Sequence, residues 1–559
     1  MQTPRSRLWF TQFSASRRVA GLVLVALAVA AGQPWAAAQP IAQDKGAEEK
    51  TPAKEKAAQP AEEDQDLKDL GIDEILGKEA GKEEGEGEPA AEGDAAKVEE
   101  YMAEGKKLFD EKKYEDAFEK FGLAQEASPQ TDLPEGLFYQ GRAALELKQT
   151  EQALQLLNNA TQLAETESET KEAPKEYYFY RGKALVEGQQ YRDAAADLSK
   201  AIRLDEGYAD AYHQRGVARR QGGQVKQAQK DLEKAIDLDG NKKEYYTDLG
   251  VLYYMDKKPE DAVKTLTKAI ELTEAESTEG KTEEELEKGY PDPYVARGAA
   301  YIVLGKEAKS PDAARDAFSR AIADSEKAIE IRPEEGSSYF NLGLALRFLD
   351  RYQEAISALT KGIHHISPES QTFSESYLRR GICWYYLGDY GMAETDFLVG
   401  LALADDDARV HLWHGLSMAK QNRMAEALQA YDRALSLRPD FYDAHYNRGL
   451  ANLALREYAK AVNSLNYFIA LRPEDPRGFF ARGLAQSYLG QDREALASYT
   501  RAVELNPRDA QAFYNRALIN ERLGRSAEAQ RDRSEALRLE PGLRSNGATA
   551  LAPYSQPEA

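Results

Sequence analysis

The chain has 559 residues, of which 42% are hydrophobic and 30% are charged, so it can bury a sizeable core. Its formal net charge of −22 repels nucleic-acid phosphates and anionic lipid, and we expect neither nucleic acid nor an anionic membrane surface among its partners. The single cysteine, Cys383, excludes an internal disulfide and a cysteine-ligated metal cluster.

The first 38 residues have the pattern of an export signal. Arg17 and Arg18 precede an apolar run over residues 19–31, and three alanines at 36–38 supply a cleavage site. Such a run spans about 20 Å as a helix, which is shorter than the ~30 Å hydrocarbon core of a bilayer. We therefore expect residues 1–38 to be a signal peptide, with no membrane-spanning segment left after cleavage, and the mature protein to be periplasmic or secreted.

Residues 39–97 read as an acidic linker. From residue 44 to 97 there are 18 acidic residues and 8 lysines, with almost no aromatic residue. Such a segment buries too little apolar surface to fold, so we expect it to be disordered. Residues 66–77 interrupt it with several leucines and isoleucines. They would form a short amphipathic helix that docks in a groove of this protein or of a partner, or only a transient helical turn in a solvated tail.

From residue 98 onward a small residue recurs, many times at intervals of 34 residues. The positions are Gly105, Gly141, Gly182, Gly216, Gly250, Gly298, Gly343, Gly381, Gly415, Gly449, Gly483 and Ala517. An alanine follows twelve residues later in eleven repeats, and Ala321 takes this place eleven residues late in the sixth. Small residues at these two places let two antiparallel helices approach closely, and the prolines that close several repeats end the second helix. One such hairpin cannot bury its apolar face alone, but stacked neighbours share a continuous core.

Residues 98–541 thereby resemble the tetratricopeptide-repeat family. Residues 513–517 (Phe-Tyr-Asn-Arg-Ala), with Ala529, Ala536 and Pro541, are one clear copy of the repeat. The resemblance implies an all-α solenoid, a right-handed superhelix of about twelve helix hairpins whose inner face holds a peptide or a helix of a partner. We expect loops where the spacing lengthens, and residues 542–559 to be a disordered tail.

A recurring pair of charges predicts a salt bridge inside the repeat. Seven repeats place an arginine directly before the small residue, and five place an aspartate three residues after the alanine of the second helix. Every repeat with the aspartate also has the arginine, while pairing to the following repeat would bring Asp231 and Asp324 opposite leucines. We therefore expect an Arg–Asp bridge between the two helices of one repeat, with a structural role.

The resemblance also implies which side chains line the inner face. They are the residues three before and one after the small residue. The candidate protein-binding residues are Lys106, Phe138, Arg142, Phe179, Lys183, Phe340, Leu378, Leu412, Tyr446, Phe480 and Tyr514. They are basic and aromatic in the first three repeats and apolar in the last six. This distribution suggests an acidic peptide at repeats one to three and an apolar helix at repeats seven to twelve. The alternative is that many of these side chains belong to the core between repeats.

The sequence shows no pattern of an enzyme site. His411, His414 and His445 fall on neighbouring helices and could in principle hold a metal, but both helix positions are core positions of this repeat and no carboxylate completes the set. We expect no metal, no cofactor and no catalytic residues. The leading hypothesis is a non-catalytic scaffold or adaptor in the cell envelope or exported space. The alternatives are a cell-wall or glycan-binding protein and, less favoured, a metal protein or enzyme.

Overall fold

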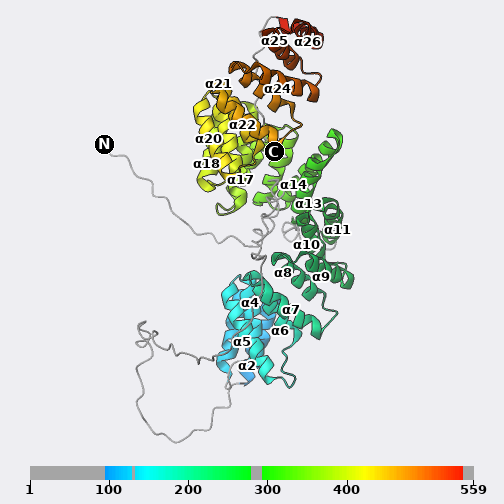
Figure 1. Cartoon of the computed structure of the whole chain (residues 1–559). Helices are drawn as coiled ribbons and strands as arrows, with labels where there is room; N and C mark the ends of the chain where they lie inside the picture. The colour runs from blue at the N-terminus through cyan, green and yellow to red at the C-terminus, as the bar shows by residue number, and fades with distance from the viewer. Residues whose placement is uncertain (1–94, 129–132, 278–291, 545–559) are drawn as a thin grey trace, which may run out of the picture. The chain divides into compact units, whose positions relative to one another are not determined.

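A computed structural model describes residues 95–128, 133–277 and 292–544. The predicted signal peptide, almost all of the predicted linker with its 66–77 segment, and residues 545–559 lie outside these ranges. Every regular element in the described ranges is helical (Figure 1), and 24 α-helices follow one another in twelve consecutive pairs. The all-α repeat fold and the number of hairpins expected from the sequence are confirmed. No helix in these ranges is both long enough and apolar enough to cross a bilayer.

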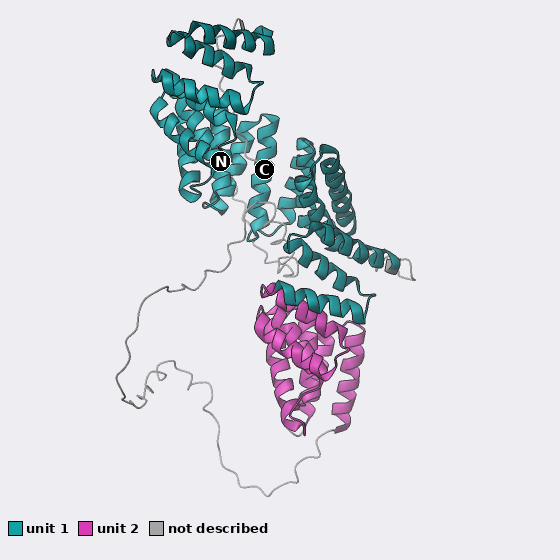
Figure 2. Ribbon diagram, turned by 45° about the vertical axis from the view of Figure 1, so that its right-hand side comes forward, with its two compact units in different colours: residues 1–33, 225–559 teal, residues 34–224 magenta. Residues whose placement is uncertain are grey.

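The described helices fall into two compact units, one within residues 95–224 and the other within residues 225–544 (Figure 2). We call their described parts the N-terminal unit and the C-terminal unit. The N-terminal unit contains α2 (Ala95–Asp110), α3 (Tyr114–Ala127), α4 (Pro134–Glu146), α5 (Thr150–Glu167), α6 (Lys175–Glu187), α7 (Tyr191–Leu204) and α8 (Ala209–Gln221).

The C-terminal unit contains the other seventeen helices and a closing 3-10 turn. They are α9 (Val225–Leu238), α10 (Lys243–Met255), α11 (Pro259–Ser277), α13 (Asp292–Glu307), α14 (Pro311–Ile331), α15 (Gly336–Phe348), α16 (Tyr352–His365), α17 (Gln371–Leu387), α18 (Tyr390–Leu403), α19 (Ala408–Lys420), α20 (Met424–Leu437), α21 (Tyr442–Ala454), α22 (Tyr458–Leu471), α23 (Pro476–Tyr488), α24 (Asp492–Leu505), α25 (Ala510–Arg522), α26 (Ser526–Leu539) and η1 (Pro541–Arg544).

The recurring small residue marks the closest approach of the two helices in a hairpin. A Cβ atom added at Gly250 would lie 2.4 Å from Cγ of Leu266, and one at Gly381 would lie 2.6 Å from Cε1 of Phe397. In nine repeats, the side chain that an added Cβ atom would contact belongs to the residue sixteen positions after the glycine. The twelve alanines of the second helices are at most 1% exposed. A small residue therefore recurs in the repeats because the backbones of the two helices in each hairpin approach closely at this position.

The turn between the two helices of a hairpin has one geometry in nearly all repeats. Seven residues after the small residue, the backbone is left-handed in eleven of the twelve repeats, although only four of these residues are glycine. The sixth repeat departs because its first helix, α13, continues through the expected position to Glu307. Only residues 308–310 join α13 to α14, so the loop expected here from the lengthened spacing is wrong. The eleven additional residues lie within the helices, and α14 has 21 residues.

Candidate peptide-binding surface

The first helices of successive repeats form a continuous layer in each unit. In the N-terminal unit α2 contacts α4, α4 contacts α6, and α6 contacts α8. In the C-terminal unit the same relation runs from α10 through α13, α15, α17, α19, α21 and α23 to α25. Within each unit, the second helices from α3 to α7 and from α11 to α24 pack between the first helix of their own repeat and that of the next. A ligand held by this layer would meet side chains of the first helices.

Seven of the eleven candidate side chains are buried inside this layer rather than displayed on it. They are Phe138, Phe179, Phe340, Leu378, Leu412, Tyr446 and Phe480, none more than 8% exposed. Phe138, for example, stacks on Tyr177 of the next first helix with ring centroids 4.1 Å apart. These residues stabilise the packing of neighbouring repeats. Their binding role stays a prediction.

The other four candidates, Lys106, Arg142, Lys183 and Tyr514, are partly exposed. Two of the basic ones already have carboxylate partners. Nζ of Lys106 lies 2.8 Å from Glu135, and Nζ of Lys183 lies 3.2 Å from Glu146. The positive charge of each of these two lysines is therefore largely compensated by its carboxylate partner.

Arg142 differs from both lysines because aromatic rings surround it. Its guanidinium carbon lies 4.3 Å from the ring centroid of Tyr180, 4.7 Å from Phe109, 5.1 Å from Tyr139 and 5.5 Å from Phe138. Its Nε atom is buried and has no hydrogen-bond partner among the described residues. Ring faces attract a cation but do not neutralise it, so Arg142 keeps its charge for an incoming anion. The sequence pattern of basic beside aromatic residues in α2, α4 and α6 thus produces one cation in an aromatic enclosure.

The predicted Arg–Asp bridges are confirmed in four repeats. In each, the arginine donates to both carboxylate oxygens of the aspartate on the second helix. The pairs are Arg181–Asp197, Arg297–Asp324, Arg380–Asp396 and Arg516–Asp532, with closest distances of 2.6 to 2.7 Å. Arg215 and Asp231, the fifth predicted pair, belong to different units, and their bridge stays a prediction. In the repeats of Arg448 and Arg482, Ser464 and Ser498 accept in place of the aspartate.

The three histidines form packing and polar contacts that are typical of structural residues. Nε2 of His411 lies 3.0 Å from the carbonyl oxygen of Asp405, and Nε2 of His445 lies 2.8 Å from that of Pro439. His414 is buried, and its Nε2 lies 3.6 Å from Oε1 of Glu394. No group of three or more potential metal ligands comes together in the part of the chain that the structure describes.

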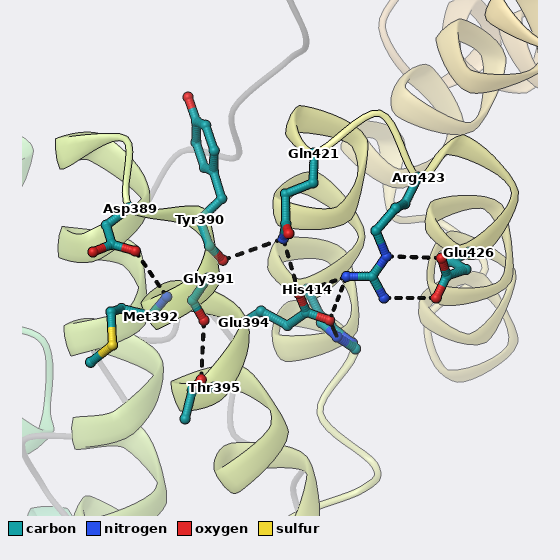
Figure 3. Close-up of polar contacts among 10 residues, drawn as sticks. All are labelled: Asp389, Tyr390, Gly391, Met392, Glu394, Thr395, His414, Gln421, Arg423 and Glu426. Carbon is teal, nitrogen blue, oxygen red and sulfur yellow. Dashed lines mark hydrogen bonds and ion pairs between the residues drawn. The ribbon is translucent and has the colours of Figure 1, made fainter.

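The surroundings of His414 are a polar network that links α18 to α19 and α20 (Figure 3). Glu394 accepts from Arg423 at 2.7 Å and from Gln421 at 2.9 Å, and Arg423 also donates to Glu426. Burial lowers the pKa of His414, and the nearby Glu394 carboxylate offsets this only in part. His414 is therefore neutral at pH 7, and the network joins two successive repeats.

These features define a protein of helical repeats whose first helices form a continuous layer within each unit, and the comparisons with known proteins identify the repeat. Models of the tetratricopeptide repeat match residues 209–242, 307–370, 378–440 and 415–486, and a TPR-repeat model matches 487–524. The chain belongs to the tetratricopeptide-repeat family. Proteins of this family generally mediate protein–protein interactions.

Similar individual proteins share only short segments with this chain. Human "Tetratricopeptide repeat protein 13" is 27% identical over 124 residues, which are 22% of this chain and 14% of that protein. The "Lipoprotein NlpI homolog" of Haemophilus influenzae is 28% identical over 119 residues, 21% of this chain and 37% of that protein. The chain thus spans well under half the length of these relatives.

Among solved structures, a crystal structure of MamA is 21% identical with a TM-score of 0.28, covering 30% of this chain and 97% of that one. The crystal structure of the APC/C hetero-tetramer Cut9-Hcn1 is 13% identical with a TM-score of 0.39, covering 80% of this chain and 94% of that one.

Proposed function

We propose that this protein is a non-catalytic adaptor that holds acidic peptide segments of partner proteins against the first helices of its N-terminal unit. The observation that carries the proposal is Arg142, a cation enclosed by four aromatic rings with an unpartnered, buried Nε atom. A carboxylate bound there would gain a charge-assisted hydrogen bond, while the rings exclude water around it. Aliphatic side chains next to the carboxylate in the peptide would contact the exposed edges of the same rings.

A glycan ligand, the alternative from the sequence, is less well supported. Sugars stack on exposed aromatic faces, whereas Phe138 and Phe179 are buried between helices. The surface at Arg142 presents a charge, and an acidic peptide complements that charge better than a neutral polymer does.

The proposal includes export of the protein through residues 1–38, so that the adaptor acts in the cell envelope or outside the cell. The support is the basic start, the short apolar run and the alanine cleavage site. Fractionation of the source cell with an epitope tag at the C-terminus tests this part. A tagged protein that keeps residues 1–38 and stays in the cytoplasm would contradict it.

A peptide-binding assay tests the proposal that the N-terminal unit holds acidic peptide segments. The probe is a labelled synthetic peptide with the sequence of residues 62–77, which contains seven acidic residues and one lysine. Its control has asparagine and glutamine in place of the acids. We expect the acidic peptide to bind with an affinity that falls as salt rises, and the amide control to bind at least tenfold more weakly.

Arg142→Met removes the charge but keeps a flexible side chain that packs on aromatic rings. It should weaken binding at this site tenfold or more, whereas Arg192→Met, at an exposed arginine of α7, should change nothing. Equal binding by both variants and the native chain would contradict the assignment of Arg142. Capture of insoluble cell-wall polymer without any peptide binding would favour the glycan alternative.

A further inference from the structure

A second group of cations lies on the first helices of the C-terminal unit, at positions that the sequence pattern did not single out. Arg347 in α15 is 5% exposed and Arg379 in α17 is 4% exposed. Lys306, near the end of α13, reaches solvent. Because α13 contacts α15 and α15 contacts α17, the three side chains belong to one continuous stretch of the layer.

The carboxylates in this region are already engaged. Glu375 in α17 forms ion pairs with Arg379 and with Arg409 of α19, the latter at 2.8 Å. Asp407 also pairs with Arg409, at 2.6 Å. Four cations therefore face two carboxylates. Neither Lys306 nor Arg347 has a carboxylate within ion-pair distance among the described residues.

Arg347 is the member of the group that most needs an anion. Its Nε and Nη2 atoms are buried and have no hydrogen-bond partner in the described part of the chain. Its guanidinium carbon lies 4.3 Å from the ring centroid of Phe348, which holds the planar group in place without accepting a hydrogen bond. A buried charge without partners is unfavourable, so such a side chain gains strongly from a ligand that supplies oxygen acceptors.

The electrostatics of the neighbouring groups point the same way. Burial, followed by the positive charges of Arg379 and Arg347, lowers the pKa of Lys306 to about 8, against the opposing effect of Glu375. Burial and Arg379 lower the pKa of Arg347 to about 10. Burial is the largest cause of both shifts, and neighbouring positive charges add to it.

We propose that Lys306, Arg347 and Arg379 form a second binding site, specific for a carboxylate group of an acidic peptide. Arg347 and Arg379 form its floor, and Lys306 at the rim closes over the bound carboxylate. The site lies in a different unit from Arg142 and does not depend on the function proposed for that residue. A peptide carboxylate fits because it brings two acceptor oxygens and one negative charge to a region that has excess donors and positive charge.

Calorimetry with the peptide of residues 62–77 and the full chain tests the site. We expect two sites in the native chain, one lost in Arg142→Met and the other weakened tenfold or more in Arg347→Met. Arg433→Met, at an exposed arginine of α20, is the matched control and should leave both sites intact. An Arg347→Met chain that keeps both sites would overturn the proposal, whatever the result for Arg142.

A second readout separates binding from a structural role. Arg347→Met removes an unpaired buried cation, so its melting temperature should equal or exceed that of the native chain. A lower melting temperature with unchanged peptide affinity would show that Arg347 only supports the fold, and would overturn the proposal. Limited acetylation at pH 8 should modify Lys306 several-fold faster than ordinary lysines, and the acidic peptide should protect it while the amide control does not. Peptide binding that leaves Lys306 unprotected would also count against the site.

The source of the carboxylate is resolved by a chain that lacks residues 44–94, which precede every described helix. Equal affinity of the Arg347 site with and without these residues identifies a peptide from another protein. Binding of added peptide only after the deletion identifies residues 44–94 as the occupant. Either result supports the carboxylate site, and no binding at Arg347 in either chain would refute it.

Discussion

The guanidinium of Arg380 in α17 donates to both oxygens of Asp396 in α18, at 2.9 and 2.7 Å, and its remaining nitrogen donates to Thr360 of the preceding repeat at 3.0 Å. One side chain therefore joins the two helices of its own hairpin and also connects that hairpin to the one before it. Arg297 makes the same three contacts, with Asp324 and with Thr267. The arginine before the small residue thus contributes to stability within and between repeats.

Replacement of Asp396 tests the strength of this connection. The Asp396 side chain is 4% exposed and that of Arg380 is 18% exposed, so Asp396→Leu leaves a largely buried guanidinium without its counter-ion. We expect a loss of about 3 kcal/mol in the free energy of unfolding, measured by urea titration. Asp396→Ser should lose less, because serine accepts a hydrogen bond from the arginine at the same place in the repeats of Arg448 and Arg482. Equal losses in the two variants would show that a neutral acceptor cannot replace the carboxylate and that its charge carries the whole effect.

A second prediction concerns the close approach of the two helices at the small residue. Replacement of glycine by alanine should destabilise the protein at Gly250 and stabilise it at Gly298. Gly250→Ala places a Cβ atom 2.4 Å from Leu266, a fully buried side chain, so the hairpin has to open. We expect a loss of about 1–3 kcal/mol. At Gly298 the nearest atoms are 3.5 Å away, so Gly298→Ala should gain up to ~1 kcal/mol from helix propensity. Urea midpoints of the two variants check this, and a loss of equal size at both positions would refute the steric explanation.

The sequence predicts structural features that recur from repeat to repeat better than features that occur only once. The small residue and the alanine recur because backbone approach requires them in every hairpin, so their spacing predicts twelve hairpins. The Arg–Asp bridge was found from the co-occurrence of the two residues across repeats. By contrast, the prediction of the inner-face residues rests on family positions alone, and two of them, Leu412 and Tyr446, are fully buried.

Arg347 was missed for a related reason. It stands four residues after Gly343, and the same position in other repeats carries buried Leu145, Tyr254 or Leu453. Arg220, Ser487 and Glu521 stand at the same position in other repeats, so the residue type alone does not distinguish Arg347. Whether such a cation has a partner depends on side chains from three different first helices, which no single repeat contains.

The left-handed turn residue offers a stabilising substitution. Arg456 follows α21 with φ of 63°, its backbone N–H donates to Leu453 O at 3.0 Å, and that of Glu457 donates to Asn452 O at 2.8 Å. This is the hydrogen-bond pattern of a helix end that favours glycine. Because Arg456 is exposed and its Cβ atom makes the left-handed conformation costly, Arg456→Gly should raise the free energy of unfolding by about 0.5–1 kcal/mol.

Arg456→Ala serves as the control for this gain. It shortens the side chain but keeps the Cβ atom, so it should give no increase in the urea midpoint. Glycine already occupies the corresponding turn position at Gly388 and Gly490, which shows that the repeat accepts it. If alanine stabilised as much as glycine, the gain would come from the loss of the arginine side chain and not from the backbone.

The buried histidines make stability depend on pH in a defined direction. Burial lowers the pKa of His414 and of His445 below the ordinary value of 6.5, so the unfolded chain binds protons more readily than the folded chain. Stability should therefore be constant above pH 7 and should fall as the pH drops through 6.5 towards the folded pKa values. His414→Gln, which keeps a polar group near Glu394 but cannot titrate, should reduce the slope of the urea midpoint between pH 7.5 and 5.5. A native chain that becomes more stable on acidification across this range, or a His414→Gln variant with the native slope, would refute the assignment of a neutral buried imidazole at this position.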